Sequence, residues 1–121
     1  METSRFSKER RFDERVEASQ KILKKYPHMV PIICEPARSS TVDVTTYHNS
    51  KYVVPRESKL GNFLMRVRSE LNIAPENAVF IFANNTLPPI SALIGDIYEK
   101  HKSSDGFLYF EFSGENVFGH M

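Results

Sequence analysis

The sequence lacks the features of several common classes of protein. It contains one cysteine, Cys34, which excludes an internal disulfide and a cysteine-rich zinc site. It has no tryptophan, and no apolar run approaches the roughly 20 residues that a membrane-spanning helix needs. The N-terminal residues METSRFSKERRF contain no apolar signal-peptide segment. We therefore expect a soluble, intracellular protein that contacts a membrane only after acquiring an anchor.

Motifs for catalysis are also missing. The sequence has no phosphate-binding loop of the form G-x-x-x-x-G-K-[ST] or G-x-G-x-x-G, and no G-x-S-x-G nucleophile elbow. The four histidines are scattered, and none pairs with another at metal-ligand spacing. Cys34 lies in an apolar run, where a thiol is usually inert packing. The sequence therefore predicts a protein that is not an enzyme and that holds no metal or cofactor.

The composition that remains is that of a small globular domain. Of the 121 residues, 40% are hydrophobic and 26% are charged, which is enough for a buried core and a solvated surface. The net charge of +1 gives no indication of wholesale nucleic-acid binding. Residues 1–25 nevertheless hold eight basic and five acidic side chains. This basic segment fits an anionic membrane or an acidic partner, or it is simply a solvated helix face.

Hydrophobic periodicity predicts helix, strand, strand, helix, strand, helix, strand, which is an α+β fold with one small sheet. The predicted segments, preceded by a helical turn at 5–10, are 12–26, 29–36, 51–55, 59–71, 78–83, 92–101 and 107–112. We expect Ser58 and Ser91 to be the N-caps of the last two helices. The polar segment 37–50 is predicted to be a loop.

Two segments carry more specific predictions. The apolar face of helix 12–26 should comprise Phe12, Val16, Ser19, Ile22, Leu23 and Tyr26. Strand 29–36 is apolar on both faces, which is typical of a central strand that is covered on both sides, and helix 12–26 is a candidate for one cover. Pro31 within it indicates a bulge or a backbone position that faces a groove.

The segments VPII and KYVVP are apolar strands interrupted by proline. Strand edges of this kind can accept an added peptide strand, although both segments could equally well only pack the core.

Taken in order, RRFDERVEASQKILKKYP, VPIICE, KYVVP, FIFANNTLPP and IYEKHKSSDGFLYFEFSGENVFG make the chain resemble the autophagy-related protein 8 family of ubiquitin-like modifiers. This family includes the light chain 3 and gamma-aminobutyrate-receptor-associated branches. The resemblance runs from about Phe6 to Gly119. It implies a ubiquitin-like β-grasp core at 27–113, a helical N-terminal extension at 1–26 that adds two helices, and a C-terminal tail at 114–121.

The resemblance also implies a covalent function for Gly119. In the family a cysteine protease cleaves after this glycine, which here would remove His120 and Met121. An activating enzyme then adenylates the carboxylate and takes it as a thioester, and a conjugating enzyme passes it to the amine of phosphatidylethanolamine. The expected protein is cytoplasmic, and lies on the autophagosomal membrane when lipidated. Phe118 is a candidate handle for these enzymes. Arg68 matches an arginine linked to protease recognition, although a plain helix-surface role is equally open.

The second implied function is binding of aromatic-x-x-aliphatic peptides from cargo receptors and adaptors. The peptide would add a strand beside KYVVP. By match to the family motif, the aromatic pocket is lined by Ile22, Pro31, Lys51, Val53 and Phe107. The aliphatic pocket is lined by Tyr52, Val54, Pro55 and Phe63.

The sequence departs from the family pattern around both pockets. Ala18 replaces an acidic residue at the first, and Ser58 and Arg66 replace aliphatic residues at the second. Basic residues that flank the peptide in the family are replaced by Met29, Asn49 and Glu70. We therefore expect peptide binding with a weakened preference for flanking acids.

Two other functions remain open from the sequence. One is an unconjugated cytosolic ubiquitin-like module that binds peptides, and the other is a cytoskeleton-associated protein that uses the basic N-terminal segment. In each case we expect a monomer without a nucleic-acid partner.

Overall fold

The computed structural model describes residues 4–37 and 50–114. The helices and strands of this part follow the predicted order, and each of their ends lies within two residues of the predicted one. They are α1 (Arg5–Glu9), α2 (Phe12–Lys25), β1 (Met29–Pro36), β2 (Lys51–Pro55), α3 (Leu60–Leu71), β3 (Phe80–Phe82), α4 (Ile94–His101) and β4 (Leu108–Ser113).

The four strands form one mixed sheet in the order β2-β1-β4-β3. β1 is parallel to β4 and antiparallel to β2, while β3 is antiparallel to β4. The prediction that residues 29–36 form a central strand is therefore confirmed. The α+β class is confirmed as well, because helices cover the sheet rather than alternating with parallel strands.

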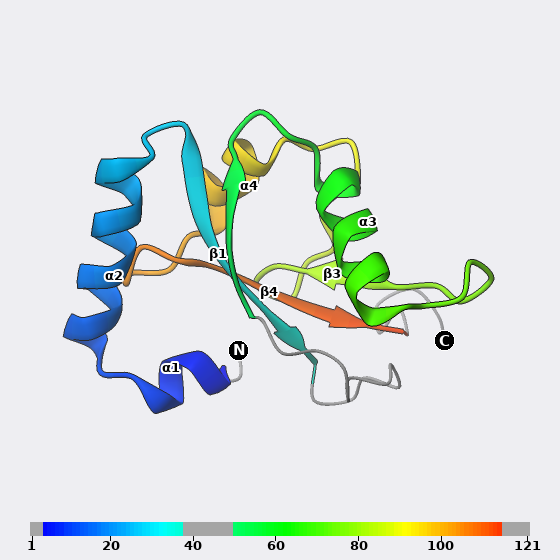
Figure 1. The fold of residues 1–121 in the computed structure, drawn as a ribbon, viewed down its shortest axis with the longest axis horizontal. Coiled ribbons are helices and arrows are strands. Elements are labelled where there is room, and N and C mark those ends of the chain that lie inside the picture. The colour runs from blue at the N-terminus through cyan, green and yellow to red at the C-terminus, as the bar shows by residue number, and fades with distance from the viewer. Residues whose placement is uncertain (1–3, 38–49, 115–121) are drawn as a thin grey trace.

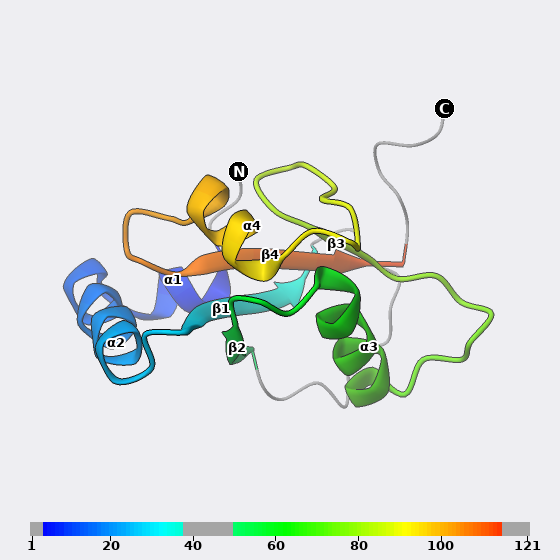
Figure 2. The same ribbon diagram turned by 90° about the horizontal axis from the view of Figure 1, so that it is seen from above.

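Each face of the sheet has its own apolar cluster. Figure 1 and Figure 2 show α1 and α2 beyond one side of the strands and α3 beyond the other, and the buried residues of α4 belong to the same cluster as those of α3. Leu108, Phe110 and Phe112 of β4 belong to the cluster under α3 and α4, which we call the α3 face. Phe107 and Ile33 pack with Phe6 of α1 on the other side, which we call the α2 face.

Pro31 lies in β1 without a bulge, because the register with β2 is continuous from Met29 to Ile33. The N–H of Cys34 donates to Ser50 on the β2 side at 2.8 Å. By the alternation of a strand, the nitrogen of Pro31 faces β4 instead, and pairing with β4 begins one residue later, at Ile32. The proline is tolerated because no ladder bond is missing there.

The predicted serine caps are wrong. α3 and α4 begin after Lys59 and Leu93, and neither residue makes a side-chain capping bond. Instead, the first backbone N–H groups of each helix donate hydrogen bonds to backbone carbonyls of the segment that precedes the other helix. The first N–H groups of α3 donate to the carbonyls of Ala92 and Ile90. Those of α4 donate to the carbonyls of Ser58 and Arg56.

The predicted apolar face of α2 extends too far along the helix in both directions. Phe12 is 51% exposed and Tyr26 is 43% exposed, with cationic side chains over both rings. Ser19, between them, is fully buried. The covered part of α2 is therefore its middle, where it crosses the sheet.

Candidate functional site

The outer edge of β2 is the surface at which the sequence predicts peptide binding. Within the described residues β2 has only β1 as a strand neighbour. Along β2, Lys51 and Pro55 are exposed, Tyr52 and Val54 are buried, and Val53 is intermediate. The outer edge of a sheet is the position at which an extended peptide can add as a further strand.

The predicted aromatic-pocket residues lie on the α2 face. Val53 pairs with Pro31 across the strands, and Lys51 pairs with Ile33. Ile22 packs against the cluster that contains Ile33 and Phe107. Pro31 and Phe107 are buried, whereas Ile22, Lys51 and Val53 offer accessible surface.

Three of the predicted aliphatic-pocket residues lie on the opposite face. Tyr52, Val54 and Phe63 all belong to the cluster under α3 and α4, and Pro55 is exposed at the end of β2. The rings of Tyr52 and Phe63 meet edge to face, with centroids 5.0 Å apart. Residues i and i+3 of an extended peptide point to opposite faces of a sheet. The spacing of an aromatic-x-x-aliphatic peptide therefore matches two pockets on opposite sides of the β2 edge.

A buried charge network holds α2 against the start of β4. The carboxylate of Asp105 is fully buried and forms an ion pair with Nη1 of Arg15 at 2.7 Å. It accepts a hydrogen bond from the N–H of Phe107 at 2.9 Å and a short one from the hydroxyl of Tyr109. Burial of the ring and this last bond raise the pKa of Tyr109 well above its ordinary value of 10.

A second contact locks the same junction. The buried hydroxyl of Ser19 donates to the carbonyl of Asp105 at 2.6 Å. Gly106, the next residue, has a positive φ of 91°, and a Cβ there would lie 2.3 Å from Oγ of Ser19. Tyr98 of α4 donates to the carbonyl of Gly106 at 2.7 Å. These contacts fix Phe107 beneath α2, where the aromatic pocket is predicted.

Sequence reasoning missed Asp105 and Arg15. The two residues are 90 positions apart, so no local pattern pairs them. The only signal was the DGF triplet before the last strand, which reads equally well as a simple turn.

α1 adds a cover over Phe107. The ring of Phe6 packs edge to face on Phe107, with centroids 5.1 Å apart. The two carboxylate oxygens of Glu35 accept the N–H groups of Arg5 and Phe6 at 3.1 and 3.0 Å. Glu35, in the central strand, therefore satisfies the N-terminal donors of α1 and holds it on the sheet.

The departures from the family pattern fall around this edge. Ala18 packs against the α2-face cluster, and Met29 is half-buried at the start of β1. The hydroxyl of Ser58 donates to the carbonyl of Pro55 at 2.7 Å. The side chains of Arg66 and Glu70 pair with each other on α3. Asn49 lies outside the described residues.

Arg68 is engaged within the fold. Its guanidinium donates to the carbonyls of Asn77 and Ala74 at 2.7 and 2.9 Å, which ties the end of α3 to the following loop. An enzyme that used Arg68 would compete with these bonds, so its role in processing stays a prediction. Phe118, Gly119 and His120 lie outside the described residues.

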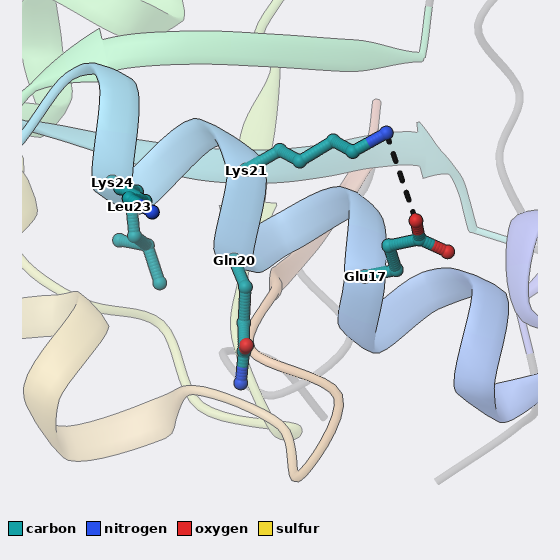
Figure 3. A pocket seen from close by; sticks show the side chains of 5 residues that line it. All are labelled: Glu17, Gln20, Lys21, Leu23 and Lys24. Carbon is teal, nitrogen blue, oxygen red and sulfur yellow. Dashed lines mark ion pairs between the residues drawn. The ribbon is translucent and has the colours of Figure 1, made fainter.

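Two hollows lie away from the β2 edge. One, of about 550 Å³, is lined by α2 residues that include Glu17, Lys21 and Lys24; Figure 3 shows Gln20 and Leu23 pointing away from Lys21. The other, of about 250 Å³, is apolar and lies between α3, β3 and residues 87–90.

The described part of the chain contains no group of acidic, histidine or cysteine side chains arranged to hold a metal ion. Over the same residues, no helix has the length and hydropathy required to cross a membrane.

Comparison with known proteins places residues 14–119 in the family described as "Autophagy protein Atg8 ubiquitin like". Autophagy-related protein 8 of Schizosaccharomyces pombe is 44% identical over 116 residues, covering 96% of this chain and 94% of that protein. The Penicillium rubens protein of the same name is 42% identical over 118 residues, covering 98% of each.

Solved structures of Atg8 proteins have the same fold as this chain. Trypanosoma brucei ATG8 superimposes with a TM-score of 0.88 at 34% identity, covering 98% of this chain and 100% of that one. Plasmodium falciparum Atg8 in complex with a Plasmodium falciparum Atg3 peptide gives a TM-score of 0.83 at 29% identity, covering 94% and 98%. The ubiquitin-like fold and the family resemblance are therefore confirmed.

Proposed function

Because this chain belongs to the Atg8 family of ubiquitin-like autophagy proteins, which are modifiers and adaptors rather than enzymes, we propose that it is processed to Gly119 and conjugated to phosphatidylethanolamine. The match to the family model extends to residue 119, so Gly119 is its last matched position and His120 and Met121 lie beyond it. Hydrolysis of the bond between Gly119 and His120 produces the carboxylate that the conjugation needs.

Partner enzymes carry out this chemistry. Adenylation of the Gly119 carboxylate consumes ATP and releases pyrophosphate, and a cysteine thiol of the activating enzyme then displaces AMP to form a thioester. After transfer to the conjugating enzyme, attack by the lipid amine forms an amide and releases that thiol. Glycine suits each step because it has no Cβ to obstruct a narrow catalytic cleft. The two acyl chains acquired with the lipid provide firm anchoring on autophagosomal membranes, while the unmodified protein is cytoplasmic.

We also propose that the β2 edge binds aromatic-x-x-aliphatic peptides of cargo receptors and adaptors. The supporting observation is that the two sets of predicted pocket residues lie on opposite faces of the outermost strand of the described sheet, as the peptide spacing requires. The related Plasmodium falciparum structure contains a peptide of Atg3, which supports a conjugating-enzyme partner for this chain too.

Peptide titration followed by amide NMR tests the second proposal. A peptide with a Trp-x-x-Leu core should shift amide signals of β2 and of Ile22, and the same peptide with flanking acidic residues should bind only slightly more tightly. Shifts confined to other surfaces would contradict binding at the β2 edge, and a strong dependence on flanking acids would contradict the weakened charge preference.

Substitution of Gly119 tests the first proposal. The wild-type protein expressed in autophagy-competent cells should partition into the detergent phase, and Gly119→Ala should stay in the aqueous phase. A Gly119→Ala variant that is still lipidated would exclude conjugation at this residue. Partitioning that is low and identical for both proteins would favour an unconjugated module.

A further inference from the structure

Arg66 covers part of the pocket in which the proposed peptide places its aliphatic residue. Its guanidinium carbon lies 4.7 Å from the centre of the Tyr52 ring. Its Nε lies 3.4 Å from Oε2 of Glu70. The hydroxyl of Tyr52 donates to the other oxygen of that carboxylate at 2.5 Å. We call these three side chains, which join β2 to α3, the Arg66 cluster.

The Arg66 cluster lies over a buried residue of the outermost strand. Tyr52 belongs to the outermost strand, yet it is only 2% exposed. The ring of Phe63 packs against it edge to face, and Arg66 lies over the ring. The Arg66 side chain itself is 51% exposed, so it can move into solvent without disturbing the core.

A peptide added beside β2 would meet this cluster directly. Side chains opposite each other on neighbouring strands project from the same face, with Cβ atoms about 4.5–5.5 Å apart. A peptide residue opposite Tyr52 therefore points to the α3 face, toward the space that the Arg66 guanidinium occupies. We propose that Arg66 is a gating residue of the aliphatic pocket, which a peptide side chain must displace from Tyr52 before it reaches Tyr52 and Phe63. This inference rests on the proposed peptide binding at the β2 edge.

Arg66 thereby determines which aliphatic side chains bind in the pocket. Displacement loses a cation–π contact and an exposed ion pair, each of them weak. A leucine buries enough apolar surface to offset this loss, whereas an alanine does not reach the ring and leaves Arg66 in place. The pocket of this chain is therefore selective for large aliphatic residues, and its affinity for all of them is lowered.

The test compares two ten-residue peptides that differ only in a Trp-x-x-Leu or a Trp-x-x-Ala core. For Arg66→Ala, calorimetry should give a Kd for the leucine peptide about threefold to tenfold lower than that of the wild-type protein. The Kd for the alanine peptide should be unchanged. Arg66→Lys keeps the charge but not the planar guanidinium, and should give a smaller gain for the leucine peptide.

Lys102→Ala is a matched control. The Nζ of Lys102 lies 5.4 Å from the centre of the Tyr98 ring and 3.2 Å from Oε1 of Glu99. Lys102 is not among the residues of the two predicted pockets. It should leave both affinities unchanged. The gating role would be overturned if Lys102→Ala increased the affinity for the leucine peptide as much as Arg66→Ala does. It would also be overturned if Arg66→Ala increased the affinity for both peptides equally, or increased neither. Peptide binding at the β2 edge would stand in each case. If neither the wild-type protein nor the variants bound a peptide, both the peptide binding at the β2 edge and the gating role of Arg66 would be overturned.

Discussion

Replacing Gly106 with alanine tests whether the turn before β4 is fitted to α2. Gly106 has a φ of 91°, in the left-handed region, and lies directly before Phe107. A Cβ at this position would lie 2.3 Å from Oγ and 3.0 Å from Cβ of Ser19. The first distance is a clash and the second is tight, so either the turn or the Ser19 side chain has to move.

The expected loss of stability has two parts. An alanine at positive φ costs about 1–2 kcal/mol. Displacing the Ser19 hydroxyl breaks its bonds to the carbonyls of Asp105 and Val16, at 2.6 and 3.0 Å. That change costs about 1 kcal/mol net. We therefore expect Gly106→Ala to lower the free energy of unfolding by about 2–3 kcal/mol.

Urea denaturation of the single and double variants provides the assay. Ser19→Ala removes the Oγ that collides with the new methyl group, so the double variant should be more stable than the sum of the single losses predicts, by about 1 kcal/mol. Gly61→Ala is the matched control, since Gly61 lies in α3 and its nearest contact would be 3.3 Å. A loss below about 0.5 kcal/mol for Gly106→Ala, or strict additivity with Ser19→Ala, would refute this account of the turn.

Three further predictions concern the contacts that hold the N-terminal helices. Arg15→Leu leaves the buried Asp105 carboxylate without its ion pair, and chemical denaturation should show a loss of about 3 kcal/mol. The folded-state pKa of Tyr109 is raised above its ordinary value of 10, so the stability that its hydroxyl contributes is fully present below pH 10 and falls as the pH rises above 10. Tyr109→Phe should therefore reduce the fall in the free energy of unfolding above pH 10 by about 1.4 kcal/mol per pH unit. An unchanged pH dependence would show that Tyr109 does not cause this fall. Glu35→Gln removes the carboxylate charge and replaces one of the two acceptor oxygens with an amide donor. Hydrogen exchange at the first amides of α1 should therefore accelerate while β1 stays protected, and equal rates in both proteins would show that Glu35 does not hold α1.

The sequence was most informative where the chain is regularly patterned. The apolar positions of α3 recur at helical spacing, and Leu60, Phe63, Val67 and Leu71 are indeed buried. The residues around β4 alternate between the two faces of the sheet, with Leu108, Phe110 and Phe112 on the α3 face and Phe107 and Tyr109 on the α2 face. Both results follow because local periodicity alone determines which side chains share a face.

Long-range contacts explain the failures. Ser58 and Ser91 are good capping residues by type, but the backbones at the starts of α3 and α4 cap each other across 29 to 39 positions of sequence. The burial of Asp105 depends on Arg15, which comes from the opposite end of the chain. A charged residue beside a glycine suggests an exposed turn, and only the docking of α2 makes it a buried partner.

The candidate site divides in the same way. The family motif predicted a strand edge and two sets of pocket residues, but it could not show that these residues lie on opposite faces with Arg66 over the Tyr52 ring. That arrangement depends on side-chain conformations at a position where this sequence departs from the family pattern.

Intact-mass analysis of the membrane-bound protein tests the central proposal most directly. The protein should be recovered from autophagosomal membranes with the mass of residues 1–119 plus one phosphatidylethanolamine, and Gly119→Ala should abolish that species. A membrane-bound protein that retains His120 and Met121, or that lacks the phospholipid, would contradict conjugation through Gly119.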